Sequence, residues 1–218
     1  MELCMKDDQL KIHRVQNSTE PEFAELVRIY SEAHPASERK SVAMLSSMVE
    51  RPEYLFQVVS QANQVLGFAI VLCFVDSDAC LLEYMAVERK WRSRGIGKFL
   101  FTELVKLQEI SERYLLAEVD SDKAETADKK DRTRRKDFYR RLGCREIEKI
   151  CYIMPQVSSA LPPAMDLLVY RRMLPDSIER TDLRKWLQSC YVQVYGKAES
   201  DPRIETMLKD LPAVLRLI

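Results

Sequence analysis

The sequence predicts an α/β protein in which a mixed sheet is flanked by helices. Two apolar, β-branched segments at 54–60 and 65–74 are separated by four polar residues, which predicts a hairpin. A further apolar strand at 80–87 leads through an amphipathic helix to another strand at 114–119. Such a crossover usually returns the chain in the same direction, so these two strands are expected to be parallel.

The first fifty residues are expected to supply one strand and two helices. Residues 9–16 carry apolar side chains at strand spacing, and 19–22, Thr-Glu-Pro-Glu, has the pattern of a capping box with proline in the first helical turn. This helix should end before Pro35, because the residue preceding a proline avoids the α region. A second short helix is expected over 42–49, stopped at Pro52.

The last part of the chain is expected to add a helix, two strands and a helical extension. Gly143 has the position of a helix-ending glycine. Strands are expected at Arg145–Ile153 and Met165–Tyr170. Asp176 and Glu179 are candidates for capping a long helix with an apolar stripe, and 202–217 predicts one more short helix.

Composition describes an ordinary globular protein. Hydrophobic residues make up 46% of the 218 residues and charged residues 31%. The 34 Lys and Arg residues equal the 34 Asp and Glu residues, so no overall field attracts nucleic acid or an anionic membrane. The basic run at 129–136 is interpreted as a solvated loop and helix face.

Cysteines and histidines give no sign of a metal site or a disulfide framework. The six cysteines form no CxxC pair, and the two histidines, His13 and His34, stand far apart in the sequence. The N-terminus lacks the pattern of a signal peptide, and no apolar run reaches the ~20 residues that span a bilayer. We therefore expect a cytoplasmic protein without a metal, a membrane partner or a nucleic-acid partner.

The junction between strand 80–87 and the following helix is the most informative segment. It reads Arg92-Ser93-Arg94-Gly95-Ile96-Gly97-Lys98, so cations and glycines gather where a helix begins. Helix N-termini present backbone N–H groups and a positive dipole end to anions, and glycine lets an anion approach the backbone. By itself, such a loop is more often a capping turn than a nucleotide site. It lacks both the Gly-Lys-Ser/Thr of a phosphate loop and the third glycine of a dinucleotide fingerprint.

Arg92-x-x-Gly95-x-Gly97, directly after an apolar strand, resembles the acyl-coenzyme A loop of the GNAT superfamily of N-acetyltransferases. A second match is Phe138-Tyr139-Arg140-Arg141-Leu142-Gly143-Cys144, which is similar to the family's Phe-Tyr-x-x-x-Gly-Phe signature. Cys144 stands where an aromatic residue is usual, and Ser93 where glycine is common. The predicted element order over 9–172 is also the family's. Residues 35–40, Pro-Ala-Ser-Glu-Arg-Lys, are similar to a poorly characterised bacterial branch.

The resemblance implies the GNAT fold, a mixed and mostly antiparallel sheet whose two central parallel strands splay apart. It implies a catalytic domain over residues 1–175. Residues 176–218 then form a C-terminal helical extension, packed on that domain or on a partner subunit. The protein is accordingly expected to be a monomer or a homodimer formed through this helix.

The resemblance also implies acetyl-coenzyme A as cosubstrate. Its diphosphate would bind at the loop and helix start: Arg92, Ser93, Arg94, Gly95, Ile96, Gly97 and Lys98. Its pantetheine arm would pair with the strand backbone at Met85, Ala86 and Val87, in the manner of an added β-strand. A backbone N–H near Met85 would then polarise the thioester carbonyl and stabilise the oxyanion.

Three side chains are candidates for proton transfer. Tyr139 matches the family's tyrosine acid, and its ordinary pKa near 10 suits protonation of a leaving thiolate. Glu118 and Glu83 both lie within apolar strands, where desolvation raises the pKa of a carboxyl group. Some relatives use a glutamate at one of these positions and some at the other. We prefer Glu118 slightly as the base, while a structural carboxylate remains an alternative for each.

The predicted function is transfer of the acetyl group from acetyl-coenzyme A to a primary amine of a small molecule or peptide. The amine would attack directly in a ternary complex. The alternative is a non-catalytic, acyl-coenzyme A-binding regulatory module. Tyr139 and the two strand glutamates favour the enzyme.

Overall fold

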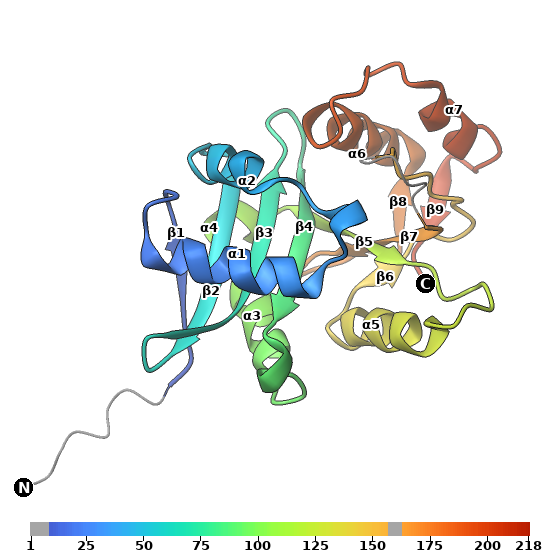
Figure 1. Ribbon diagram of the computed structural model, residues 1–218. Helices are drawn as coiled ribbons and strands as arrows, with labels where there is room; N and C mark the ends of the chain where they lie inside the picture. Colours follow the sequence, from blue (N-terminus) through green and yellow to red (C-terminus); the bar gives the residue numbers. More distant parts are fainter. Residues whose placement is uncertain (1–8, 157–162) are drawn as a thin grey trace, which may run out of the picture. The chain divides into compact units, whose positions relative to one another are not determined.

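The structure, a computed structural model, describes residues 9–156 and 163–218 (Figure 1). Helices and strands alternate along it as the α/β prediction requires. In chain order they are β1 Lys11–Val15, α1 Pro21–Ala33, a 3-10 turn Ala36–Glu38, α2 Val42–Val49, β2 Tyr54–Gln61, β3 Gln64–Cys73, β4 Ala79–Val87, a 3-10 turn Arg89–Trp91, α3 Ile96–Leu104, α4 Gln108–Ser111, β5 Tyr114–Asp120, α5 Lys129–Arg141, β6 Arg145–Glu146, β7 Met165–Tyr170, β8 Ser177–Glu179, α6 Arg180–Gln193, α7 Pro202–Leu208 and β9 Val214–Arg216.

Seven strands of the described residues form one mixed sheet in the order β1-β2-β3-β4-β5-β7-β6. The pairs β1–β2, β2–β3, β5–β7 and β6–β7 are antiparallel. A short turn joins β3 to β4, whereas α3 and α4 intervene between β4 and β5. The one parallel pair is therefore β4 with β5, since a parallel connection needs a long crossover. This arrangement confirms the predicted fold class.

The chain forms two compact units that share strand β4. The first comprises Met1–Cys73 and Leu82–Leu107, and the second comprises Phe74–Leu81 and Gln108–Ile218. Neither coincides with the predicted domain 1–175, and that boundary stays a prediction.

Both faces of the sheet are covered in the first unit. All residues of β2 from Tyr54 to Val59 and of β3 from Val65 to Cys73 are buried, although successive side chains point to opposite faces. Helix α1 lies across these strands in Figure 1 and packs on β3, while α3 packs on β2 and β3. The hairpin between β2 and β3 turns at Ala62 and Asn63, which both have positive φ, as a tight hairpin turn requires.

Strands β3 and β4 approach each other closely at Gly67. A Cβ atom at this position would lie 2.7 Å from the carbonyl oxygen of Ala86 and 3.2 Å from Cα of Val87. Real side chains do not tolerate such contacts, so only glycine allows this spacing. The close approach fixes the backbone of β4 directly before the loop that leads to α3.

Helix α6 packs against strand β5 within the second unit. The rings of Trp186 and Tyr114 lie 4.6 Å apart between centroids, and Nε1 of Trp186 donates to Oδ1 of Asp78 at 2.8 Å. The apolar stripe of α6 is buried, as a helix with an amphipathic sequence requires. These contacts of α6 lie within its own chain.

Two helix starts differ from prediction. The N-cap of α1 is Glu20, whose side chain makes no capping bond to the helix. Its Oε1 instead accepts from the backbone N–H groups of Gln16 and Asn17, so the predicted capping box is wrong. The caps predicted from Asp176 and Glu179 are wrong as well. Ser177–Glu179 forms strand β8, which pairs with β9, and the N-cap Glu179 makes no side-chain bond to α6.

The strand predicted at Arg145–Ile153 is much shorter in the structure. Strand β6 ends at Glu146, and the chain beyond it pairs with the C-terminal residues. Ile147 forms a bridge to Leu217, and the N–H of Glu148 donates to Arg216 O at 2.9 Å. The region 202–217 likewise holds both helix α7 and strand β9. These pairings join residues far apart in the sequence, so local patterns did not reveal them.

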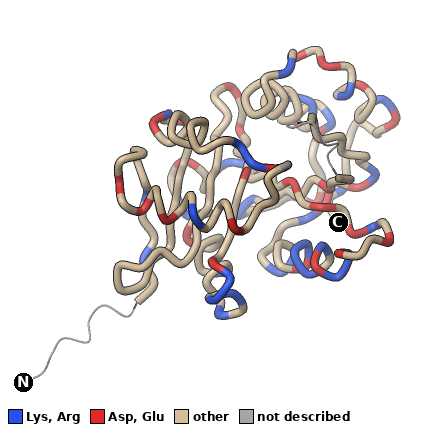
Figure 2. Tube along the Cα trace, in the orientation of Figure 1, with Lys and Arg blue, Asp and Glu red and all other residues tan. Residues whose placement is uncertain are grey.

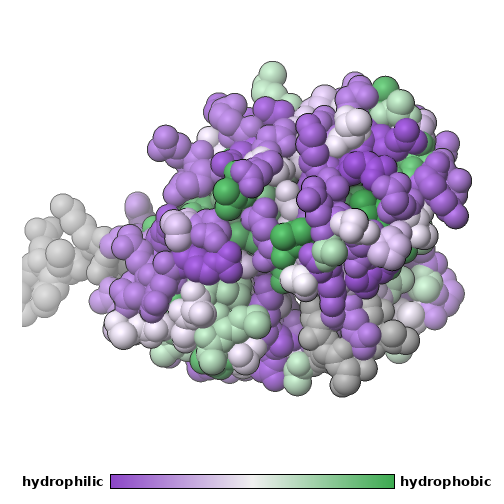
Figure 3. Space-filling view, turned by 90° about the horizontal axis from the view of Figure 1, so that it is seen from above, coloured by the Kyte–Doolittle hydropathy of each residue, from purple (hydrophilic) through white to green (hydrophobic). Residues whose placement is uncertain are grey.

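Charged side chains are spread over the surface. Figure 2 shows Lys and Arg gathered on α5 and on the loop before α3, and the face seen in Figure 3 is mainly hydrophilic. On α5 most cations have acidic neighbours, including the pairs Lys129–Glu125 and Arg132–Asp128. Except for Lys136, this supports the interpretation of a solvated helix face. Within 9–156 and 163–218, no helix combines the length and apolarity that crossing a bilayer requires.

Candidate active site

The junction of β4 and α3 forms an anion-binding geometry. Helix α3 begins at Ile96, and its N-cap, Gly95, has a left-handed φ of 81°. The first intrahelical bond runs from Phe99 N to Gly95 O at 2.9 Å. The N–H groups preceding Phe99 in this helix therefore lack an acceptor within it. A Cβ atom at Gly95 would meet no atom within 4 Å, so open space lies beside this backbone.

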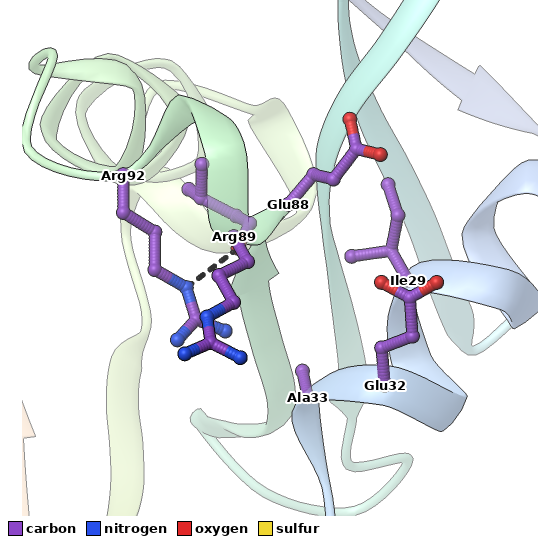
Figure 4. A pocket seen from close by; sticks show the side chains of 7 residues that line it. Ile29, Glu32, Ala33, Glu88, Arg89 and Arg92 are labelled. Carbon is purple, nitrogen blue, oxygen red and sulfur yellow. Dashed lines mark hydrogen bonds between the residues drawn. The ribbon is translucent and has the colours of Figure 1, made fainter.

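A cavity of about 510 Å³ opens beside this junction, within the first unit (Figure 4). Its walls come from α1 and from the end of β4 with the following loop. The lining residues are Ile29, Glu32, Ala33, Val87, Glu88, Arg89 and Arg92. The guanidinium groups of Arg89 and Arg92 point the same way in Figure 4, and Nε of Arg92 donates to the carbonyl oxygen of Val87 at 3.0 Å. Two cations therefore line the cavity.

Strand β4 changes its burial halfway along. Residues Ala79–Leu82 are buried, whereas Glu83–Val87 are half-buried, so the second half can be reached by a ligand. This half includes Met85, Ala86 and Val87, the positions predicted for the pantetheine arm. The backbone N–H of the next residue, Glu88, is occupied by Leu66 O at 2.8 Å. The ligand-accessible stretch therefore ends where the basic loop begins.

The carboxylate of Glu83 is held by two partners in the first unit. Nζ of Lys40 lies 2.5 Å from Oε2, and the hydroxyl of Tyr54 donates to Oε1 at 2.9 Å. The Glu83 side chain is only 3% exposed. Burial and the carboxylate together raise the pKa of Tyr54 above its ordinary value, which keeps the phenol protonated as a donor. The ammonium and the phenol thus satisfy both oxygens of the buried carboxylate.

These contacts anchor the segment between α1 and α2. Besides the Lys40 ion pair, the hydroxyl of Tyr84 donates to Glu38 O at 3.1 Å. The hydroxyl of Tyr30 accepts from the N–H of Lys40 at 2.7 Å, and Nη1 of Arg39 donates to Ser31 O at 3.0 Å. Glu83 and Tyr84 of β4 thus both hold this segment. Glu38 and Arg39 help to hold the segment in place, Glu38 through its carbonyl oxygen and Arg39 through its guanidinium group.

Glu118, on β5, lies in a polar cluster of the second unit. The hydroxyl of Tyr152 donates to Oε1, and the hydroxyl of Tyr195 donates to Oε2 at 2.5 Å. Sγ of Cys190 donates to Oε1 at 3.7 Å. Burial foremost, together with nearby Cys190 and Glu118, raises the pKa of Tyr152 well above its ordinary value. Both phenols therefore serve as neutral donors to the carboxylate.

Tyr139, near the end of α5, is 7% exposed. Burial raises the pKa of its phenol above the ordinary value, with a further contribution from Cys144. Burial likewise raises the pKa of the Cys144 thiol to about 12. Gly143 follows the helix with a φ of 95°, in the helix-ending role predicted for it. The phenol of Tyr139 thus stays protonated over the whole physiological range.

Lys136 is buried one turn before Tyr139, an arrangement that the sequence did not reveal. Its ammonium lies 2.6 Å from carboxylate oxygens of both Glu146 and Asp166, and 3.0 Å from Oδ1 of Asp122. Its side chain is 1% exposed. This cluster ties α5, and with it Tyr139, to β6 and β7. The sequence did not distinguish Lys136 from the other basic residues at 129–136, although its neighbours Arg134 and Arg135 are exposed.

The structure distributes the predicted site residues over both units. The first unit brings together Arg92–Lys98, Met85–Val87 and Glu83, and the second holds Tyr139 and Glu118. Sequence reasoning missed the partners of both glutamates, Lys40 and Tyr54 for Glu83 and the residues 152, 190 and 195 for Glu118. A buried glutamate signals that partners must exist, but their identity depends on contacts that are distant in sequence.

Comparison with protein-family models matches residues 52–146 to the acetyltransferase (GNAT) domain. Both predicted GNAT motifs, Arg92–Gly97 and Phe138–Cys144, fall inside this range. A search of curated proteins gave no match.

Several solved structures share the fold. A GNAT-family protein from Bacteroides thetaiotaomicron is 21% identical with a TM-score of 0.69, covering 85% of this chain and 98% of its own. Arabidopsis thaliana NAA60, solved with acetyl-CoA, is 15% identical with a TM-score of 0.55, covering 74% and 98%. A GNAT-family protein from Desulfovibrio desulfuricans is 20% identical with a TM-score of 0.52, covering 74% and 97%.

Replacing Lys136 tests the buried cluster. Lys136→Met should lower the free energy of unfolding by about 1–3 kcal/mol at pH 7, because Glu146 and Asp166 lose their buried cation and keep Arg140 and Lys123. Urea denaturation measures this change. Lys130→Met, on the exposed side of the same helix, is the control and should change the free energy by less than about 0.5 kcal/mol.

The free energies of unfolding of wild type and Lys136→Met should differ less at acidic pH. Burial alone raises the pKa of Asp166, but hydrogen bonds from Lys123 and Lys136 outweigh it and hold the pKa below its ordinary value. A lowered carboxyl pKa gives stability that is complete above the unfolded value, about 4, and is lost as pH falls through the folded value. The difference between wild type and Lys136→Met should therefore shrink below about pH 4. A constant difference from pH 7 to pH 3 would contradict the ion pairing.

Proposed function

We propose that this chain is a GNAT-type acetyltransferase that acetylates a primary amine of a small molecule or peptide, and the match of residues 52–146 to the GNAT acetyltransferase domain supports this, as does the sheet order. The acetyl donor is acetyl-coenzyme A, and the amine attacks it directly in a ternary complex. The observation that carries the proposal is the start of α3. Its left-handed N-cap, Gly95, has open space beside it, its first N–H groups lack an acceptor within the helix, and Arg89 and Arg92 line the cavity nearby.

The diphosphate of acetyl-coenzyme A fits the chemistry of this junction. Unbonded N–H groups and the positive end of the helix dipole favour an anion at the start of α3. The residues assigned to this role are Arg92, Ser93, Arg94, Gly95, Ile96, Gly97 and Lys98. The open space beside Gly95 supports the assignment, since a ligand must come close to the backbone there.

The pantetheine arm is assigned to the backbone of Met85, Ala86 and Val87. The half-buried state of this part of β4 supports that role, because a backbone that pairs with a ligand must be accessible to it. An N–H near Met85 would polarise the thioester carbonyl and stabilise the oxyanion that forms during attack.

The reaction needs one acid and one base. The amine nitrogen attacks the thioester carbonyl carbon, the tetrahedral intermediate collapses, and the carbon–sulfur bond breaks. Tyr139 gives its phenolic proton to the leaving thiolate. Its place in the Phe138–Cys144 motif supports this role, whereas burial raises the pKa of the phenol and makes it a weaker acid than a free tyrosine. A glutamate takes the proton that the amine loses.

Glu118 is the better candidate for this base. Glu83 is bound to the ammonium of Lys40, and loss of its charge would leave a buried cation without its partner. Its contacts suit an anchor for the segment between α1 and α2. Glu118 instead accepts hydrogen bonds from two phenols and a thiol.

Coenzyme A release tests the proposed activity. Wild-type protein with acetyl-CoA and a panel of primary amines should release free thiol in an amine-dependent manner, with one acetylated product per thiol. Mass spectrometry identifies the product. Tight acetyl-CoA binding without release on any amine would instead favour the non-catalytic module.

Tyr139→Phe isolates the acid. It should lower kcat by about 10²–10⁴-fold, the usual contribution of a positioned proton donor, and leave the Kd for coenzyme A almost unchanged. Steady-state kinetics with the preferred amine and calorimetry provide the two values. A variant that keeps its kcat removes Tyr139 from the mechanism.

Gly95→Trp blocks the proposed diphosphate site. The indole would occupy the open space at the start of α3 and should abolish acetyl-CoA binding in calorimetry. Gly196→Trp is the matched control, since Gly196 also has a left-handed φ, 61°, with nothing near a Cβ atom. Both variants bear the same backbone strain. Wild-type affinity in a folded Gly95→Trp protein, or equal loss in both, would refute the assignment.

A further inference from the structure

Glu118 receives its partners from three separate parts of the second unit. Tyr152 comes from the segment after β6, Cys190 from α6, and Tyr195 from the turn that ends α6. The phenols donate to opposite oxygens, Tyr152 to Oε1 and Tyr195 to Oε2 at 2.5 Å. The carboxylate is thus bonded at both oxygens, which fixes its plane as well as its position.

All three of these partners lie outside the segment that matches the GNAT domain, and two of them come from the C-terminal segment. The match ends at residue 146, whereas Cys190 and Tyr195 belong to the C-terminal segment 176–218. The contacts that hold this segment include the Trp186 bond to Asp78 and the Tyr191 hydroxyl, which donates to Ile153 O. Tyr191 therefore holds the residue next to Tyr152, while Tyr195 bonds Glu118 itself.

We propose that the C-terminal segment is a working part of the active site, because it supplies Tyr195 as a positioning residue for the base Glu118. The inference rests on the proposed function, in which Glu118 accepts the amine proton. Tyr195 holds the carboxylate ionised and oriented before the acceptor arrives. A carboxylate that accepts hydrogen bonds has a lower pKa than one that does not.

The surroundings of Glu118 are built from weakly acidic groups. Tyr152, Cys190, Tyr191 and Tyr195 face it, and the Arg203–Asp201 ion pair lies behind Tyr191. Arg203 is 5.4 Å from the centre of the Tyr191 ring. Burial raises the pKa of both Tyr152 and Tyr191, so these phenols stay neutral at working pH. Neutral donors stabilise the carboxylate anion through hydrogen bonds rather than through an ion pair.

Tyr195 is also suited to connect the cluster with solvent. Its residue is half-buried, whereas Tyr152 is 6% exposed and Cys190 is 3% exposed. Of the two phenols bonded to Glu118, Tyr195 is thus the more accessible. Replacing it by phenylalanine should leave the packing of the ring in place and remove the hydrogen bond to Glu118.

Tyr195→Phe tests the inference by two readouts. Carbon-13 NMR of the glutamate carboxyl groups, with Glu118→Gln to assign the signal, gives the pKa of Glu118 directly. Loss of one donor to the charged form should raise this pKa by about one pH unit. The acid limb of the pH profile of kcat/KM should move to higher pH by the same amount, with the Kd for acetyl-CoA unchanged.

Tyr191→Phe is the matched control on the same helix. Its hydroxyl bonds Ile153 O rather than Glu118, so it should leave the Glu118 pKa and the acid limb where they are in wild type. Equal shifts in both variants, or no shift with Tyr195→Phe, would overturn the inference.

The NMR titration does not depend on activity, so failure of the proposed function is seen separately. Absence of thiol release by wild type rejects the transferase. Full kcat in Glu118→Gln rejects Glu118 as the base, and with it the positioning role. Active wild type, an impaired Glu118→Gln and a shifted Tyr195→Phe profile together support the inference.

Discussion

The unfilled hydrogen-bonding capacity at the start of α3 is the constraint on which the proposed site depends. An α-helix cannot satisfy its first N–H groups internally, and here the N-cap is a glycine without a side chain to do so. Gly95 instead adopts a left-handed conformation that leaves space beside the backbone. Strand β4 lies close to β3 at Gly67. The start of α3 follows after the ligand-accessible stretch of β4, Glu83–Val87. An anion bound there would accept hydrogen bonds from these N–H groups.

Buried charge explains much of the remaining architecture. Glu83, Glu118 and Lys136 are each held by partners from distant segments, since a charged group leaves water only when hydrogen bonds or counter-charges replace it. Each cluster also joins elements: Glu83 holds the segment between α1 and α2, Lys136 holds α5, and Glu118 binds the C-terminal segment. The candidate catalytic residues therefore differ in the contacts by which they also hold the fold together.

Local patterns were sufficient for most helices and strands. The hairpin of β2 and β3, strand β7 and helix α2 lie at or within a residue of the predicted ranges, because apolar periodicity and proline or glycine boundaries define them. The failures are of one kind. Strand β6 is short because the residues after Glu146 pair with Arg216–Ile218. Asp176 does not cap a helix because the residues that follow it form strand β8, which pairs with β9. Pairing between distant segments leaves no local signature.

The sequence by itself indicated the resemblance to GNAT acetyltransferases, the candidate anion-binding loop and the candidate acid and bases, because each depends on residue types at fixed short spacing. Tertiary structure alone decided which carboxylate is tied to a cation and which to phenols. It also decided that Lys136, within a run of exposed cations, is buried. Burial and ion pairing depend on the neighbours that folding brings from elsewhere in the chain, and one segment read alone does not specify them.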